Sequence, residues 1–156
     1  HIRVFAGKPS GPDKRDQDFQ HLVAALKQAL EYAGSRGVFL GIENHGYLTE
    51  NAEDVLKIVE AVPSPWLGIN LDTGNFKVHG YEDIEKTVSK AVNCQIKTMI
   101  NDGGSRKPAD FARIFAFLRK ADYRGIVALE YEDKEDPKTG VPKIIDRLRE
   151  LAAASG

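Results

Sequence analysis

Short apolar segments alternate with segments of helical periodicity along the chain, and this alternation constrains the fold more than any other feature. The apolar segments cover residues 2–6, 38–42, 67–71, 94–100 and 126–129. They are almost continuously apolar, which is typical of parallel strands buried on both faces. No linker or low-complexity segment interrupts the alternation. The sequence therefore predicts one α/β domain built on a parallel sheet.

The segments between these strands place apolar residues three or four positions apart, as one buried helix face requires. The first helix is defined by Phe19, Leu22, Val23, Leu26, Leu30 and Ala33. Asn51 is the expected N-cap of the second helix, which ends at "VPSP" because proline disfavours a helical residue before it. Later helices are expected over 81–91, after Pro108 and over 141–151.

A repeated strand–helix unit fits either an open doubly wound sheet or a (β/α)8 barrel. No GxGxxG or GxxxxGK[ST] motif follows any predicted strand, so neither the dinucleotide-binding nor the P-loop version has local support. The choice between sheet and barrel therefore depends on what the strand ends carry.

Composition narrows the classes of function. The 156 residues are 42% hydrophobic and 29% charged, which is enough for one domain with a sizeable core. A net charge of −1 argues against a general nucleic-acid binder, and no apolar run is long enough to suggest a membrane span. The single cysteine, Cys94, excludes an internal disulfide. We expect it to be a buried strand residue of a cytoplasmic protein.

Four successive strands end in side chains that offer oxygen ligands to a metal ion. These side chains are Glu43, Asp72, Gln95 and Glu130, at intervals of 29, 23 and 35 residues. The C-terminal strand ends of a barrel face one site, so the four would converge. Three carboxylates and an amide oxygen favour Mg²⁺ or Mn²⁺ over softer metals. A divalent cation would also offset the mutual repulsion of the carboxylates.

Each residue has a structural alternative when it is taken alone. A glutamate at a strand end is often an ion-pair partner, and Asp72 in "DTGN" could bond backbone amides in a turn. Gln95 could be an ordinary buried amide that makes hydrogen bonds. The coincidence over four strands is what favours a shared site.

Four neighbouring residues are candidates for substrate binding. His45 would share the side of Glu43 on a continuing strand, or else lie on a surface loop. Asn75 could contact substrate or cap the turn after Asp72. Lys97 would share the side of Gln95 on an alternating strand, and it could stabilise an oxyanion or neutralise the carboxylates. Glu132 would share the side of Glu130 by the same alternation.

The motifs "GIENHG", "GINLDTGNF", "QIKT" and "ALEYE" together resemble the xylose isomerase-like TIM-barrel superfamily, the sugar isomerase and epimerase group that also contains AP endonuclease family 2 domains. The resemblance covers nearly the whole chain and aligns its five strands with strands four to eight of that barrel. It implies an incomplete (β/α)8 barrel in which residues 1–156 form one domain without the first three βα units. The missing initiator Met agrees with this expectation.

The resemblance also implies roles for the residues at the strand ends. Glu43 and Glu130 match the family's metal-binding acid/base glutamates, and Asp72 matches its aspartate ligand. The next ligand is usually histidine, where this chain has Gln95. That departure weakens the case for Zn²⁺, so Mn²⁺ or Mg²⁺ is the favoured metal, with Zn²⁺ or Co²⁺ as the alternatives. Some dehydratases of the family resemble this chain in having glutamine there.

We therefore expect a metal-dependent isomerase or epimerase that acts on a sugar-like hydroxy-ketone. Glu43 and Glu130 would transfer the proton through an enediolate. A dehydratase and a non-catalytic binding domain are the alternatives, whereas four histidines and the net charge of −1 argue against a DNA-repair endonuclease. Because five strands cannot close an eight-stranded barrel, we also expect a homodimer that covers the open sheet edges.

Overall fold

A computed structural model describes residues 1–154 and contains a five-stranded parallel sheet in the order β1-β2-β3-β4-β7. Its strands are β1 (Ile2–Val4), β2 (Leu40–Glu43), β3 (Leu67–Asp72), β4 (Ala91–Ile96) and β7 (Val127–Leu129). The helices are α1 (Arg15–Ser35), α2 (Ala52–Ala61), α3 (Gly80–Thr87), α4 (Phe111–Lys120) and α5 (Pro137–Ala153), with a 3₁₀ turn over Val88–Lys90. The predicted α/β class and five parallel strands are confirmed, and the sheet forms the larger part of a (β/α)8 barrel.

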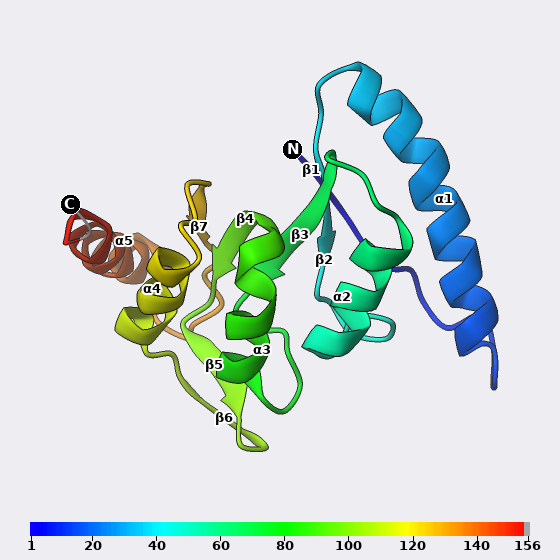
Figure 1. Ribbon diagram of the computed structural model, residues 1–156. Coiled ribbons are helices and arrows are strands. Elements are labelled where there is room, and N and C mark those ends of the chain that lie inside the picture. Colours follow the sequence, from blue (N-terminus) through cyan, green and yellow to red (C-terminus); the bar gives the residue numbers. More distant parts are fainter. Residues whose placement is uncertain (155–156) are drawn as a thin grey trace.

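The helices cover one face of the sheet. In Figure 1, α2, α3 and α4 lie in front of the strands, while α1 and α5 lie toward the two ends of the sheet. Alternate strand residues pack against these helices as a buried core that includes Ile42, Ile69, Leu71, Cys94 and Ile96. Because strand residues alternate between faces, the polar residues Asn70, Asn93 and Gln95 belong to the opposite, inner face.

The pairing register between β3 and β4 determines which side chains of the inner face lie opposite one another. Ile69 pairs with Ala91, but Asn70 pairs with Asn93, so β4 contains one extra residue at this point. Gly68 permits the close approach, since a Cβ there would lie 2.3 Å from Val92 Cγ1. The shift also brings Gln95 opposite Asp72 at the ends of the two strands.

The fourth strand differs from the prediction of 94–100. It runs over Ala91–Ile96, and the chain then forms a separate antiparallel hairpin of β5 (Met99–Asp102) and β6 (Ser105–Pro108). Gly103 and Gly104 have positive φ values of 63° and 75°, which suit a tight turn. The sequence "NDGG" is therefore a hairpin turn and not only a strand end.

Helix boundaries follow their capping residues. Asn51 caps α2 as predicted, because its side chain accepts a hydrogen bond from the Asp54 amide at 2.9 Å. Asp110 caps α4 in the same way, so this helix begins after Pro108, as predicted, while Pro108 itself ends β6. The predicted helix 81–91 is also shorter than expected, since Ala91 already belongs to β4.

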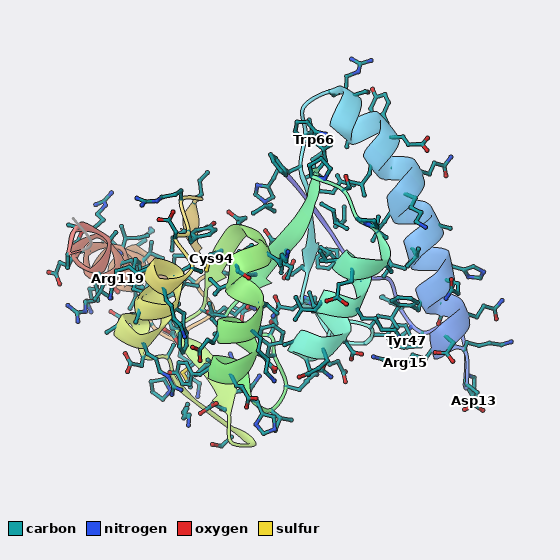
Figure 2. The ribbon with its side chains drawn as sticks, viewed as in Figure 1. Asp13, Arg15, Tyr47, Trp66, Cys94 and Arg119 are labelled. Carbon is teal, nitrogen blue, oxygen red and sulfur yellow. The ribbon has the colours of Figure 1, made fainter. Side chains whose placement is uncertain are left out.

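The loop after β2 is attached to the start of α1, as the labelled pair Arg15 and Tyr47 shows in Figure 2. Arg15 donates to the Tyr47 carbonyl and to Asp54, both at 2.7 Å, and the Tyr47 hydroxyl donates to Asp18. Hydrogen bonds from Ser10 and Tyr47 lower the pKa of Asp18 to about 2. These contacts restrain the loop that carries His45.

Cys94 is fully buried in β4, as predicted, and burial raises the pKa of its thiol to about 12.

Over residues 1–154, no helix is both long and apolar enough to cross a membrane. Within the same residues, β1 pairs only with β2 and β7 only with β4, so each presents one unpaired edge.

Candidate metal centre

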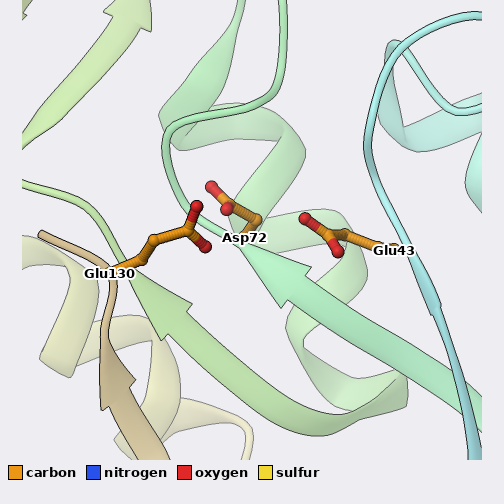
Figure 3. Close-up of side chains that lie close together, drawn as sticks. All are labelled: Glu43, Asp72 and Glu130. Carbon is orange, nitrogen blue, oxygen red and sulfur yellow. The ribbon is translucent and has the colours of Figure 1, made fainter. Parts of the chain in front are cut away.

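Three carboxylates from separate strand ends meet at one point. Glu43 ends β2, Asp72 ends β3 and Glu130 follows β7, and one oxygen of each lies within 4.8 Å of the others. Figure 3 shows the three side chains pointing toward one another. Oxygen ligands on opposite sides of a hard divalent cation lie about 4–5 Å apart. The spacing therefore suits a shared cation.

Two of these carboxylates are almost inaccessible to water. Glu43 is 1% exposed and Asp72 is 0% exposed. Within residues 1–154, neither Glu43 Oε2 nor Asp72 Oδ2 has a hydrogen-bond partner. Glu43 Oε2 lies 3.2 Å from Arg3 Nη1, and Asp72 Oδ2 lies 3.6 Å from Lys97 Nζ. Buried carboxylate oxygens without hydrogen bonds are costly, so these two fit a bound divalent cation.

Lys97 partly neutralises the cluster. Its buried ammonium lies 3.2 Å from Glu130 Oε1 and 3.0 Å from Glu132 Oε1, in addition to its contact with Asp72. Burial opposes the charge of Lys97, but attraction to Asp72 and hydrogen bonds to Glu132 and Glu130 raise its pKa. One ammonium among three carboxylates still leaves negative charge for a further cation.

The carboxyl groups of Asp72 and Glu130 differ in their pKa values. Burial, followed by repulsion from Glu130 and Glu43, raises the pKa of Asp72 to about 7 against the attraction of Lys97. Burial of Glu130 is outweighed by hydrogen bonding and attraction to Lys97 and by a hydrogen bond from Gln95, so its pKa is lowered. Without a bound cation, the centre thus holds a carboxyl group that binds a proton more readily than usual beside one that ionises more readily.

Two predicted residues lie beside Glu43. Its Oε1 accepts a hydrogen bond from Asn75 Nδ2 at 3.2 Å and lies 3.3 Å from His45 Nδ1. The ring of Phe5 packs edge-on against His45 with a centroid distance of 5.2 Å. The structure therefore groups His45 and Asn75 around Glu43, and Lys97 and Glu132 around Glu130.

Gln95 lies next to the carboxylates with its amide in a defined direction. Its Nε2 donates to Glu130 Oε2, and its Oε1 accepts from Asn70 Nδ2. The oxygen that the sequence suggests as a metal ligand is therefore engaged by Asn70. For Gln95 Oε1 to bind a metal ion, the terminal amide of Gln95 would have to rotate so that its oxygen faces the carboxylates.

Asn44 is a functional residue that the sequence reasoning did not select. Its side chain donates to the Asp72 carbonyl at 2.7 Å and accepts from the Asp72 amide at 2.8 Å. It is fully buried, and it holds the ends of β2 and β3 together. Its position directly after Glu43 in "GIENHG" is the signal that could have identified it.

A family model described as "Xylose isomerase-like TIM barrel" matches residues 1–151. Among curated proteins, the chain is 37% identical over 99 residues to a 3-oxo-isoapionate decarboxylase of Pectobacterium atrosepticum. That match covers 62% of this chain and 34% of the relative. The chain thus spans about a third of the curated relative.

Solved structures share the fold at low sequence identity. The 3-keto-D-glucoside 4-epimerase of E. coli matches with a TM-score of 0.74 and 18% identity, over 95% of this chain and 63% of that chain. A D-tagatose 3-epimerase-like protein gives 0.75 and 20%, over 99% and 64%. A probable 3-DHS dehydratase of Bacillus anthracis gives 0.72 and 17%, over 97% and 62%. At these identities the likeness establishes the fold alone.

Proposed function

The chain belongs to the xylose isomerase-like TIM barrel family, and from that premise we propose that it carries the metal centre of a divalent-metal-dependent isomerase or epimerase. The substrate class is a sugar or sugar-like hydroxy-ketone. The observation that carries the proposal is the convergence of Glu43, Asp72 and Glu130, with a buried oxygen on Glu43 and on Asp72 that lacks a hydrogen bond.

The proposed ligands are Glu43, Asp72 and Glu130, with Gln95 as the fourth. All four offer oxygen, which favours Mn²⁺ or Mg²⁺ over Zn²⁺ or Co²⁺. When bound, the cation would polarise the substrate carbonyl and offset the negative charge of an enediolate.

The protein's own residues would move the proton. One of Glu43 and Glu130 enters the step as a carboxylate and removes the proton next to the carbonyl. The other enters as a carboxylic acid and donates its own proton to the neighbouring carbon or to the opposite face. Contacts from Asn75 and His45 orient Glu43, while the ammonium of Lys97 holds the carboxyl group of Glu130 in place. Lys97 is also close enough to the carboxylates to stabilise an oxyanion of the substrate.

A hollow beside His45 offers room for the rest of the substrate. It measures about 460 Å³ and is lined by Phe5, Gly7, Lys8, Pro9, His45 and Tyr47. It adjoins Glu43 through His45 Nδ1, which lies 3.3 Å from Glu43 Oε1. The hollow therefore supports a substrate that extends from the metal centre over the loop after β1.

Decarboxylation or dehydration is the second candidate. The 37% identical relative is named a decarboxylase, and a structural neighbour is named a dehydratase. The resemblance described above also implies a glutamine at the position of Gln95 in some dehydratases of the family. Loss of CO₂ from a 3-oxo acid leaves the electron pair next to the carbonyl, and one glutamate would then protonate that carbon. All of these reactions would use the same carboxylates. The candidate functions are therefore distinguished by which substrate the protein converts.

The test is exchange of the α-proton of keto-sugars with deuterated water in the presence of Mn²⁺. Glu43→Gln keeps the shape but removes the base, and we expect the exchange rate to fall by about 10²–10⁴-fold. Exposed Glu60 on α2 supplies the matched control, because Glu60→Gln should leave the rate unchanged. Full exchange by Glu43→Gln refutes the role, and metal binding without any exchange favours a binding domain. Release of CO₂ from a 3-oxo acid without exchange on keto-sugars favours the second candidate.

A further inference from the structure

Three buried amides on the inner face lead in a line to Glu130. Asn93 Nδ2 donates to Asn70 Oδ1 at 2.9 Å, Asn70 Nδ2 donates to Gln95 Oε1, and Gln95 Nε2 donates to Glu130 Oε2. Asn70 is 0% exposed, Asn93 is 6% exposed and Gln95 is 9% exposed. The register shift between β3 and β4 creates this line, which we name the amide relay (Asn93, Asn70 and Gln95).

The direction of the relay is a property of all three amides together. A primary amide has a donor end and an acceptor end, so reversing one member alone would set donor against donor and acceptor against acceptor. Such mismatches are costly in a buried site, and the members must therefore turn together. His1 Nε2 also lies 3.2 Å from Asn70 Oδ1, but an imidazole nitrogen donates or accepts according to its tautomer and does not fix the direction.

Glu130 determines which direction is favourable without metal. An ionised carboxylate only accepts hydrogen bonds, so it requires the NH₂ end of Gln95. A cation bound to Glu130 would replace the NH₂ group of Gln95 as the positive partner of this carboxylate. Gln95 Oε1 could then face the cation, provided that Gln95 Nε2 finds an acceptor on Asn70 and Asn70 Nδ2 finds one on Asn93.

We propose that Asn70 and Asn93 are positioning residues which set the end of Gln95 that faces the metal centre, and that the relay reverses when metal binds. The inference rests on the proposed function, because it assumes a cation among Glu43, Asp72 and Glu130. Neither asparagine touches the cation or the substrate. Both act through Gln95, at one and two hydrogen bonds from it.

Substitutions can set the direction of the relay. In Asn93→Asp the new side chain only accepts, so Asn70 must donate to it and accept from Gln95, which turns Gln95 Oε1 toward the centre. We expect Mn²⁺ to bind about tenfold more tightly. Asn70→Leu has a similar size but breaks the relay, and we expect binding to weaken by about 10–100-fold, as for other residues that orient ligands.

The double variant separates the relay from simple charge attraction. Asn93→Asp also adds a negative charge, which would attract Mn²⁺ through space. If the gain in Mn²⁺ affinity depends on the relay, it disappears in the double variant Asn93→Asp/Asn70→Leu. If the gain comes from Coulombic attraction alone, it persists in the double variant. If Asn70→Leu does not fold, Asn93→Leu can be used in its place to interrupt the relay. Weaker Mn²⁺ binding by Asn93→Leu is then the expected result.

The experiment combines Mn²⁺ titration calorimetry with NMR of side-chain NH₂ groups. In metal-free protein, Asn93→Asp should shift the NH₂ resonances of Gln95, while those of Asn101, which donates to the Gly74 and Phe76 carbonyls, stay in place. Unmoved Gln95 resonances, or a gain that persists in the double variant, would overturn the relay. Wild-type protein that binds no Mn²⁺ would instead overturn the proposed function, and the metal-free spectra would still decide whether the amides turn together.

Discussion

Asn44 holds the backbone of Asp72 at two points, donating to its carbonyl at 2.7 Å and accepting from its amide at 2.8 Å. The two hydrogen bonds make the amide of Asn44 a bridge between the ends of β2 and β3. The carboxylate of Asp72 therefore lies where Glu43 and Glu130 can share a cation with it.

Removing this bridge should affect stability and metal binding together. Asn44→Ala leaves a buried backbone amide and carbonyl without partners, so we expect the free energy of unfolding to fall by about 2–3 kcal/mol in urea titrations. We also expect weaker Mn²⁺ binding. Asn51→Ala, which removes the α2 cap, should cost about 1 kcal/mol and leave Mn²⁺ affinity unchanged. Equal effects of the two substitutions on Mn²⁺ affinity would contradict the positioning role of Asn44.

Lys97 and a metal ion would compete for the same carboxylate oxygens. Lys97→Met should destabilise the protein in chelator by about 3 kcal/mol, because Asp72, Glu130 and Glu132 lose their shared ammonium. The same substitution should increase the thermal stabilisation by Mn²⁺. Lys86→Met, which breaks exposed ion pairs with Glu53 and Glu82, serves as the surface control and should change neither quantity appreciably. A smaller stabilisation by Mn²⁺ in Lys97→Met would refute the competition.

Asp72 should make the stability of the metal-free protein depend on pH. Its pKa is raised from 3.8 to about 7 in the folded state, so folding takes up a proton between these values. The contribution is fully present below pH 3.8 and is lost as the pH rises through about 7. Urea titrations in chelator should therefore show a negative slope of stability against pH in this window, relative to Asp72→Asn. Parallel profiles for the two proteins would contradict the raised pKa.

The parallel sheet and the strand ends could be predicted because both depend on local pattern. Apolar runs mark the five strands, and a parallel arrangement brings their C-terminal ends together. The sequence therefore predicts that Glu43, Asp72 and Glu130 lie near one another, as the structure shows. Alternation along the strand also placed Lys97 on the side of Gln95. The hairpin of β5 and β6 was missed because "NDGG" was interpreted only as the end of a strand.

The contacts that depend on register could not be predicted. The amide relay exists because β4 has one extra residue opposite β3, and no local pattern reveals that shift. The hydrogen bonds between Asn44 and Asp72 likewise join residues 28 positions apart. The position of Asn44 directly after Glu43 indicates a residue at the strand end, but it does not reveal this partner. These are tertiary contacts, whereas periodicity reports only which side of a strand a residue occupies.

The open edges of the sheet predict self-association. Within residues 1–154, β1 and β7 each leave one row of backbone donors and acceptors unpaired, and such edges readily pair with another chain. We propose a dimer that covers them, and we expect sedimentation equilibrium to give twice the mass of 17.2 kDa. Amides of β1 and β7 should also exchange more slowly with deuterium as protein concentration rises. A monomer at all concentrations would contradict this proposal.

The most direct test of the metal centre is anomalous X-ray scattering from a crystal of the protein soaked in Mn²⁺. The account predicts one strong manganese peak between the carboxylates of Glu43, Asp72 and Glu130, which disappears in crystals of Glu43→Gln/Asp72→Asn. Absence of a peak there at saturating Mn²⁺, or a peak that survives the double substitution unchanged, would contradict it.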